Sequence, residues 1–244
     1  STLDRSSAAS DVYKRQLHHR LQHLQCNLHH LLQSNQKQKL KRAAYRTCIS
    51  MIKVEFSTKE EWLEARKSCL TGTTVGEHIG IVSPYAPKTP QEMEKSPAVI
   101  FGKNCETSIL TIFKNLPEIA KQTLVEPTIM HTLWYSDYDP RIAGSFDALA
   151  WEKGMEGFCE CKSTGAGLYD LKNRVIPDTT WLQILHYFTI NPNFQFCYLV
   201  VCDYPQFGNR SVKIDWLRIS RQEVQDRITN LQGWHAYLLA KGVR

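Results

Sequence analysis

RIAGSFDALAWEKGMEGFCECKSTGAG, residues 141–167, places charged side chains inside otherwise apolar, strand-like sequence. Asp147 lies in the first apolar run, and Glu160 and Lys162 lie in the second. We expect the two runs to be neighbouring strands of a buried sheet, where an unpaired charge is disfavoured. These three residues are therefore candidates for a chemical role.

The two-residue period of a strand predicts which of these side chains share a face. Glu160 and Lys162 should lie on one face, and Cys159 and Cys161 on the other. If the strand of Asp147 is the hairpin partner, its carboxylate meets that of Glu160, and the two repel unless a cation or proton intervenes. Oxygen ligands without a nearby histidine favour Mg²⁺, with Mn²⁺ as a substitute. A lysine beside such an ion would hold a water or stabilise charge on a phosphate, which indicates phosphodiester hydrolysis.

An Asp/Glu-x-Lys pattern alone proves little, because Asp170-Leu-Lys172 repeats it. That second copy lies in the polar, glycine-containing stretch STGAGLYDLKNR and is expected in a loop. The alternative for the first copy is a structural cluster of ion pairs without catalytic function.

Length and composition indicate an ordinary globular protein. The 244 residues, 42% hydrophobic and 22% charged, suffice for one sizeable domain, with or without an appendage. No apolar run approaches the roughly 18 residues of a membrane span, and no charged-apolar-small signal sequence is visible. We therefore expect a soluble intracellular protein of the cytoplasm or nucleus, with no membrane partner. The eight cysteines are scattered without a Cys-x2-Cys pair, which favours reduced, buried thiols over disulfides or a metal cluster.

Charge is distributed unevenly along the chain and suggests three segments. Residues 1–56 hold ten Lys/Arg against three Asp/Glu, whereas the remainder holds 20 against 21. Residues 1–16 lack apolar periodicity and are treated as a non-native or disordered leader. Residues 17–56 are expected to form a basic helical extension, and residues 57–244 a nuclease domain.

The expected extension carries two features of its own. Its leucines recur with helical spacing at Leu17, Leu21, Leu24, Leu28 and Leu31, which predicts a docking helix or one lying on its own domain. The sequence KQKLKRAAYR at 37–46 is either a solvated helix end or an arm that contacts phosphates.

The rest of the chain predicts an α/β fold with a mixed central sheet flanked by helices. Expected elements are a helix at 59–67, a turn at 71–76, a loop at 84–97, a helix at 98–116, strands at 124–134, 142–151 and 157–162, a helix at 179–190 capped by Asp178, strands at 194–204 and 210–219, and a helix at 220–240.

Five motifs together resemble a known nuclease family. In order they are WLEARKSCLTGTTVG, GKNCETSI, GSFDAL, ECKS and WLQILHY. They resemble the lambda-exonuclease-like, YqaJ-type viral recombinase nucleases of the PD-(D/E)XK superfamily over about residues 58–203. The resemblance implies a restriction-endonuclease-like core and a metal-dependent 5′-to-3′ exonuclease acting on the ends of linear duplex DNA in recombination or repair. Phe146 departs from the pattern, because the superfamily has proline there.

The resemblance also implies roles for residues around the metal. Asp147 and Glu160 would be direct ligands, and the backbone carbonyl of Cys161 would add a third oxygen. Glu106, on the helix before the sheet, would bind the metal or its water. Lys162 would orient and activate the attacking water.

For the substrate, the resemblance implies a second set of residues. Gln183 would contact the reacting phosphate, with Tyr187 one turn later on the same helix face. The segment that would receive the phosphate of the DNA end contains Arg66, Thr71, Thr73 and Thr74. As alternatives, Arg66 and Glu106 are solvated helix residues, and Gln183 and Tyr187 form a polar edge packed beside Trp181.

Two rival functions stay open at this point. One is an endonuclease of the same fold, of restriction, resolvase or repair type. The other is a catalytically inactive module that binds DNA or a partner, such as a single-strand annealing protein. The resemblance also allows a homotrimer, because relatives in this family can close into rings around DNA.

Overall fold

The computed structural model describes four stretches of the chain: 51–82, 97–164, 168–203 and 214–243. The expected leader, the leucine-spaced helix and the basic arm lie outside these residues. Within them the elements are β1 (Met51–Glu55), α2 (Lys59–Lys67), α3 (Gly72–Ile79), α5 (Pro97–Asn115), α6 (Pro117–Ala120), β2 (Thr123–Pro127), β3 (Thr132–Ser136), β4 (Ala143–Gly144), β5 (Ala148–Glu152), β6 (Met155–Thr164), α7 (Asp178–Ile190), β7 (Phe194–Asp203), β8 (Ile214–Ser220), the 3₁₀ helix η2 (Gln222–Val224) and α8 (Gln225–Ala240).

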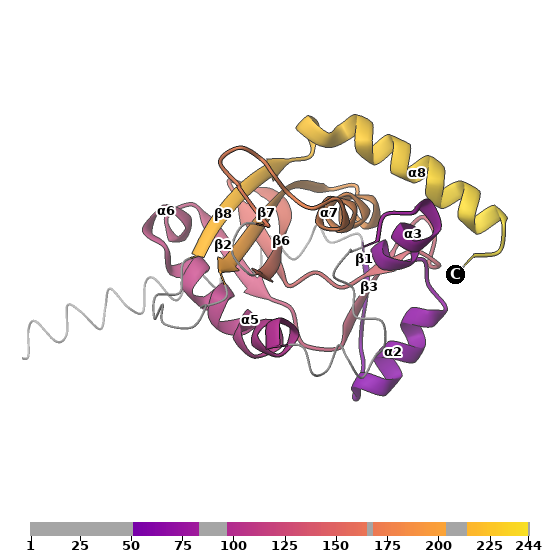
Figure 1. The fold of residues 1–244 in the computed structure, drawn as a ribbon, viewed down its shortest axis with the longest axis horizontal. Coiled ribbons are helices and arrows are strands. Elements are labelled where there is room, and N and C mark those ends of the chain that lie inside the picture. The colour runs from indigo at the N-terminus through magenta and orange to yellow at the C-terminus, as the bar shows by residue number, and fades with distance from the viewer. Residues whose placement is uncertain (1–50, 83–96, 165–167, 204–213, 244) are drawn as a thin grey trace, which may run out of the picture. The chain divides into compact units, whose positions relative to one another are not determined.

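The strands form two sheets, and the larger confirms the predicted mixed α/β fold. Five strands follow the order β2-β5-β6-β7-β8, and three strands form a second sheet in the order β1-β3-β4. Among the described strands, only β6 and β7 pair in parallel, and α7 makes the crossover between them. The other pairs of these strands are antiparallel. Figure 1 shows α5, α6 and α7 beside the larger sheet and α2 and α3 beside the smaller one.

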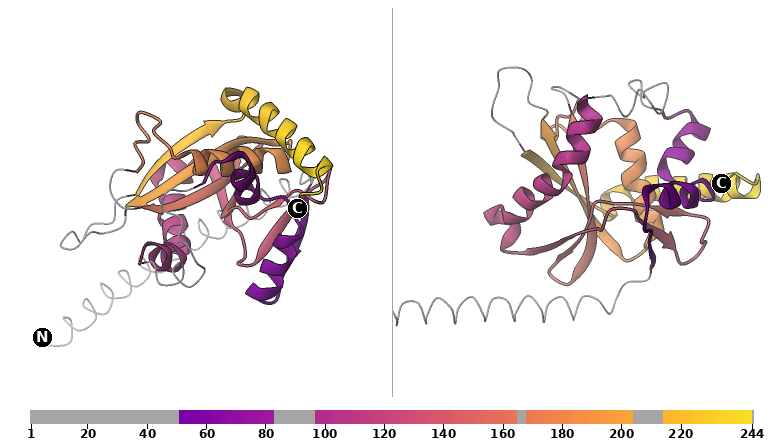
Figure 2. Two further views of the ribbon diagram at one scale, coloured as in Figure 1. Left: turned by 45° about the vertical axis from the view of Figure 1, so that its right-hand side comes forward. Right: turned by 90° about the horizontal axis from the view of Figure 1, so that it is seen from below.

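Helices cover both faces of the larger sheet (Figure 2). On one face α5 packs through Phe113, which meets the ring of Tyr198 edge to face at 5.2 Å. On the other face α7 packs through Phe188, whose ring lies 5.1 Å from that of Phe158. Burying apolar side chains against both faces is the main stabilising term of this architecture.

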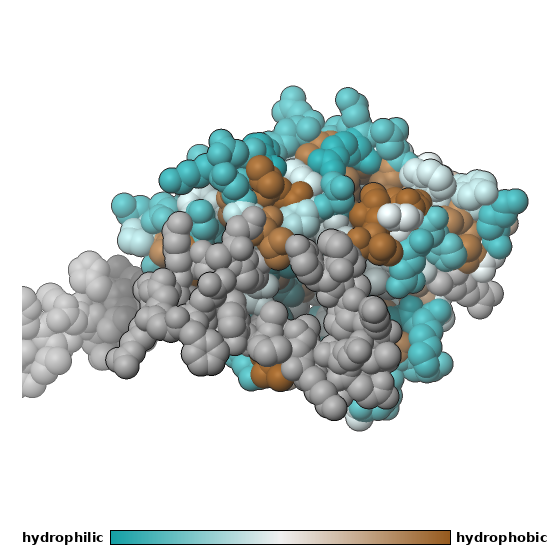
Figure 3. Space-filling model, viewed as in Figure 1, coloured by the Kyte–Doolittle hydropathy of each residue, from teal (hydrophilic) through white to brown (hydrophobic). Residues whose placement is uncertain are grey.

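The described surface carries small apolar patches among hydrophilic residues on the face in Figure 3.

Strand β6 confirms the predicted alternation of side chains. Cys159 is buried in the core beneath α5, and Cys161 packs against the same cluster. Phe158 and Glu160 therefore point to the opposite face, toward α7. The sheet thus directs the cysteines into one core and the charged pair toward the other side.

Two predictions about the first residues of the fold are wrong. Residues 51–55, assigned to the helical extension, form β1, which pairs with β3 from Met51↔Ser136 to Glu55↔Thr132. The segment TGTTVG, expected as a turn, begins helix α3 instead, because the Thr71 side chain accepts a hydrogen bond from the Thr74 amide and caps it.

Two further boundaries differ from the sequence prediction. The single strand expected at 124–134 is two strands, β2 and β3, separated by a turn in which His131 has φ 63°. Asp178 is the first residue of α7 rather than its cap, and the cap position is occupied by Pro177 without a side-chain hydrogen bond.

None of the helices in the described stretches is both long and apolar enough to cross a bilayer.

The pairing of β6 with β7 predicts a sensitive position at Gly157. A Cβ there would overlap the Phe196 carbonyl oxygen and approach its ring carbons to 2.7 and 2.8 Å. We expect Gly157→Ala to lower the free energy of unfolding by about 1–3 kcal/mol, measured by urea denaturation. Gly233→Ala is the control, because nothing lies within 4 Å of the position that a Cβ would take there on α8. That control should be neutral or stabilising by up to about 1 kcal/mol, and equal effects at both positions would contradict the prediction.

Candidate active site

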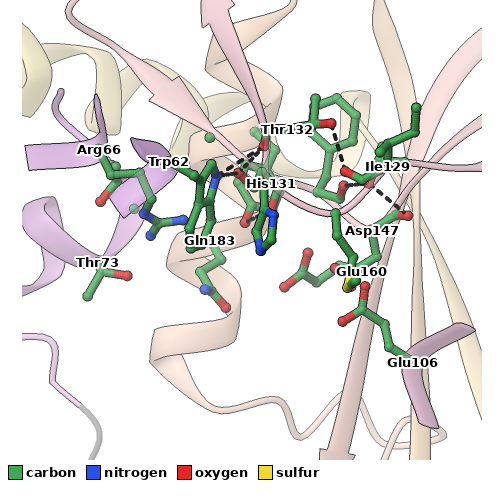
Figure 4. Close-up of a pocket in the computed structure, with 18 of the residues that line it drawn as sticks. Trp62, Arg66, Thr73, Glu106, Ile129, His131, Thr132, Asp147, Glu160 and Gln183 are labelled. Atoms are coloured by element: carbon green, nitrogen blue, oxygen red, sulfur yellow. Dashed lines mark hydrogen bonds between the residues drawn. The ribbon is translucent and has the colours of Figure 1, made fainter. Parts of the chain in front are cut away.

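A pocket of about 400 Å³ lies where α2, the start of α3, α7 and the β5–β6 hairpin meet. Figure 4 shows three carboxylates at one end, from Glu106, Asp147 and Glu160, and Arg66 at the other. Its lining includes most of the residues predicted from sequence: Arg66, Thr71, Thr73, Glu106, Asp147, Glu160, Gln183 and Tyr187.

The hairpin of β5 and β6 brings Asp147 beside β6, as expected from the sequence. Ala148 pairs with Cys159, and the Asp147 amide donates to the Cys159 carbonyl at 3.1 Å. The Cys161 amide donates to the Asp147 carboxylate at 2.5 Å. The aspartate is thus held by the strand that carries Glu160.

Glu160 and Lys162 form a partly buried ion pair on the α7 side of β6. The Lys162 Nζ lies 2.6 Å from Glu160 Oε1 and donates to Gln183 Oε1 at 2.7 Å. Glu160 is only 4% exposed, and its second oxygen, Oε2, is buried with no hydrogen-bond partner among the described residues. An unpaired buried oxygen is costly, and this one is free to accept a hydrogen bond or bind a cation. Lys162 itself does not line the pocket but reaches it through these two partners.

Burial and neighbouring charge shift the pKa of two of these carboxylates. Burial, followed by the charges of Glu160 and Glu106, raises the pKa of Asp147 well above its ordinary value. Burial also raises the pKa of Glu106, and a hydrogen bond with the Asp147 side chain partly offsets this. For Lys162 burial opposes the charge, but Glu160 and Asp147 outweigh it and raise the pKa. One lysine therefore does not neutralise the three carboxyl groups, and the site favours additional positive charge.

The donor set fits a hard divalent cation by its chemistry. All candidate donors are oxygens, and Glu160 Oε2 is available without breaking an existing hydrogen bond. In the described part of the chain, no group of three His, Cys, Asp or Glu side chains is arranged to enclose an ion. Asp147 is bound to the Cys161 amide, and Glu160 is bound to Lys162. A cation would therefore exchange for some of these contacts.

The other end of the pocket presents a guanidinium group. The Arg66 Cζ lies 4.5 Å from the ring centre of Trp62, and burial lowers the pKa of Arg66. None of the ion pairs formed by the described residues involves Arg66. A half-buried arginine stacked on an aromatic ring and lacking an acidic partner is suited to bind an anion.

The threonines expected near Arg66 differ in what they can offer. Thr71 lines the pocket, but its hydroxyl caps α3 and lies 3.1 Å from that of Thr74. Thr73 lines the pocket within the first turn of α3. Thr74 is not among the lining residues. Thr73 is therefore the better placed of the three for contact with a ligand.

Gln183 and Tyr187 lie one turn apart on α7, as predicted. Gln183 lines the pocket between its two ends and accepts the hydrogen bond from Lys162. Tyr187 is 6% exposed, and its hydroxyl donates to the Ser145 carbonyl at 2.8 Å. Its hydroxyl is thus bound to the backbone that leads to Asp147, which is a structural contact.

Sequence reasoning did not assign a site role to several residues of the pocket wall, among them Trp62, His131 and Ser145. Trp62 donates its indole N–H to the Thr132 carbonyl and the Ser145 hydroxyl, each at 3.3 Å. Its position four residues before Arg66, on one helix face, is a signal that could have identified it. His131 carries no such signal, because its place depends on the β2–β3 turn.

Comparison with known proteins supports the fold. No protein-family model matches the chain, and no curated protein matches it. The crystal structure of an alkaline exonuclease, LHK-Exo from Laribacter hongkongensis, is similar with a TM-score of 0.50 and 15% identity, over 75% of this chain and 94% of that protein. The chain has the fold of an alkaline exonuclease. The structure of LHK-Exo in complex with dAMP aligns over the same shares with a TM-score of 0.48 and 15% identity.

Within this exonuclease fold, the two Asp/Glu-x-Lys patterns have the contrasting settings expected of them. Asp170 and Lys172 are exposed, and the Asp170 carboxylate accepts hydrogen bonds from the Asn173 amide and side chain. Glu160 and Lys162 meet inside the fold instead. The second copy therefore supplies matched controls for experiments on the first.

The crowded carboxylates predict that Asp147→Asn stabilises the cation-free protein near neutral pH. The folded-state pKa of Asp147 is raised, so the folded protein binds more protons than the unfolded chain and loses stability as pH rises from about 4 through that pKa. Removing the charge should raise the melting temperature of the cation-free protein at pH 7, measured by thermal unfolding in EDTA.

Added Mg²⁺ or Ca²⁺ should raise the melting temperature of the unmodified protein and have less effect on Asp147→Asn. Asp170→Asn is the control and should keep the full response to the cation. A destabilised Asp147→Asn protein in EDTA would show that the repulsion is not as described.

Proposed function

We propose that this protein is a metal-dependent deoxyribonuclease, and specifically a 5′-to-3′ exonuclease on linear duplex DNA in recombination or repair. The observation that carries the proposal is the under-neutralised carboxylate cluster, in which Glu160 is buried, Asp147 is partly buried and Glu106 is exposed. This cluster shares one pocket with an arginine lacking an acidic partner among the described residues. The exonuclease fold supports it. Glu160 Oε2, which is buried without a hydrogen-bond partner within the described chain, is a donor available to such a cation.

Asp147 and Glu160 would hold the divalent cation, Mg²⁺ or its substitute Mn²⁺, together with the backbone carbonyl of Cys161. Glu106 would bind the ion or its water from α5. Such an ion lowers the pKa of bound water and neutralises charge that develops on a phosphate. The protein's own contribution is to fix these oxygens on a rigid hairpin, where Asp147 is anchored by β6 amide and carbonyl groups.

Lys162 would act as a fixed cation beside the scissile phosphate. Its raised pKa keeps the amine protonated in the cation-free site, held between Glu160 and Gln183. In that state it donates hydrogen bonds and orients water or a phosphate oxygen rather than accepting a proton. Gln183 would connect this cation to the phosphate that enters the pocket.

Arg66 and Thr73 would receive the terminal 5′-phosphate. Both lie in the same pocket as the carboxylates, so a strand anchored by its end would present the next phosphodiester to the cation site. A pocket of about 400 Å³ lies in the size range of small-molecule sites, and we propose that it takes the end of a single strand. This arrangement favours stepwise removal of nucleotides from a 5′ end.

The expected homotrimer and annealing-protein partner stay predictions. Light scattering would give the mass of the assembly, and pull-down with a purified annealing protein would test the second.

Glu160→Gln should reduce nucleotide release from linear duplex DNA in Mg²⁺ by about a hundredfold or more, because it removes a metal ligand. Lys162→Met should lower the turnover rate by about a hundredfold while leaving the cation-induced rise in melting temperature in place. The assay follows acid-soluble nucleotides from end-labelled DNA. The exposed pair supplies the controls, and Asp170→Asn and Lys172→Met should both keep normal turnover.

Covalently closed circular DNA separates the rival functions in the same assay. The unmodified protein should spare the circles, and their cleavage would instead establish an endonuclease. Duplex binding without nucleotide release, unchanged in Glu160→Gln, would establish an inactive binding module.

Arg66→Ala should abolish the preference for 5′-phosphorylated over 5′-hydroxyl ends, because it removes the guanidinium fork that binds the phosphate. Arg66→Lys should restore only part of it, since an ammonium group cannot make the bidentate contact. The measurement is the ratio of initial rates on the two substrates. Lys67→Ala, at the exposed neighbouring position on α2, is the control. An unchanged ratio in Arg66→Ala would remove Arg66 from the site.

A further inference from the structure

Two histidines outside the pocket form a buried hydrogen-bonded chain that the proposed chemistry does not use. His186 of α7 and His235 of α8 are 0% and 1% exposed. Nδ1 of His186 lies 3.2 Å from Nε2 of His235, and Nε2 of His186 lies 3.0 Å from the Ala143 carbonyl oxygen. The chain thus connects α8 through α7 to strand β4.

The hydrogen bonds assign the protons in this chain. A carbonyl oxygen only accepts, so the His186 proton must be on Nε2, and Nδ1 of a neutral ring must then accept from His235. Burial lowers the pKa of His186 to about 4 and that of His235 to about 2, so both rings are neutral near pH 7. Nδ1 of His235 has no hydrogen-bond partner among the described residues. His235 therefore acts toward His186 through a single N–H donor.

Ala143, the acceptor at the end of the chain, joins the two halves of the pocket. Its amide donates to the Leu70 carbonyl at 3.2 Å, while its own carbonyl accepts from His186. Leu70 is followed directly by the Thr71 cap and the start of α3, which carries Thr73. In the other direction, the polypeptide runs from Ala143 through only three residues to Asp147.

Helix α7 packs tightly against Gly144 and Ser145, which follow Ala143, and lies close to Gly72 at the start of α3. A Cβ at Gly144 would lie 2.7 Å from the Tyr187 ring, and the Tyr187 hydroxyl donates to the Ser145 carbonyl. On the other side, a Cβ at Gly72 would lie 3.5 Å from that of His186. His186 thus lies beside Gly72 at the Arg66 end of the pocket and forms a hydrogen bond with Ala143, which leads to the carboxylate end.

We propose that His186 and His235 are positioning residues that fix the spacing between the carboxylate end of the pocket and its Arg66 end. His186 holds Ala143 through its Nε2–H, and the His235 N–H holds the His186 ring in the orientation and tautomer that this contact needs. Helix α8 thereby contributes to the site without touching it. The kinetic consequence rests on the proposed exonuclease function, whereas the structural consequence does not.

The test compares His235→Gln with His235→Met. The two side chains have nearly the same length and shape, but only glutamine supplies an N–H donor to His186. Both variants are first shown to be folded by circular dichroism at the assay temperature. A role in packing alone predicts equal behaviour, whereas the positioning role predicts rescue by glutamine only.

Hydrogen exchange at the backbone amides tests whether the two segments are held in place, and it does not require nuclease activity. In His235→Met the amides of Leu70 and Ala143 should exchange about tenfold faster than in the unmodified protein, and in His235→Gln they should exchange at nearly the unmodified rate. Unchanged exchange in His235→Met, or equally fast exchange in both variants, would overturn the proposal.

Kinetics on 5′-phosphorylated linear duplex reads the functional consequence. His235→Met should lower kcat about tenfold with a smaller change in KM, and His235→Gln should stay within about threefold of the unmodified protein. A normal kcat in His235→Met would also overturn the positioning role. Absence of nucleotide release from the unmodified protein would instead refute the exonuclease function, and hydrogen exchange would still decide whether the histidines position the pocket.

Discussion

Negative charge held inside the protein is the constraint on which the site depends. Glu160 is almost fully buried, Asp147 is bonded to a β6 amide, and Glu106 approaches them from α5. Lys162 lies among these carboxylates, and the charges of Glu160 and Asp147 raise its pKa. Burial of unbalanced charge is tolerated only where the surrounding fold is stable enough to enforce it. The aromatic and aliphatic packing on both faces of the sheet supplies that stability.

The connectivity of the fold explains how distant segments reach one pocket. The parallel pairing of β6 and β7 requires a crossover, and α7 is that crossover. Because α7 crosses the face where Glu160 and Lys162 point, its residue Gln183 meets them directly. The same helix supports α3 and β4 on its other sides. One crossover helix therefore organises both ends of the pocket.

Sequence alone predicted the parts of the site that follow local rules. Strand period two placed Glu160 and Lys162 on one face, and helix period placed Gln183 and Tyr187 together. Tertiary contacts were beyond its reach: the hydrogen bond of the Tyr187 hydroxyl and the place of the His131 ring depend on segments far apart in the chain. The prediction of a turn at TGTTVG was wrong for a different reason. Residues that favour turns also cap helices, and tertiary contacts decide which of the two structures forms. Phe146, where the family pattern has proline, packs in the core. Its ring stacks on that of Trp134, with 5.2 Å between the ring centres.

Strand β1 has a practical consequence for anyone who shortens this protein. A fragment begun at residue 57, where charge composition suggests a boundary, would lack Met51–Glu55 and leave the backbone of β3 open along that side. An uncovered strand bearing Leu133 and Trp134 invites pairing between molecules. Truncations intended for purification or crystallisation should therefore retain Met51 and the residues that follow it.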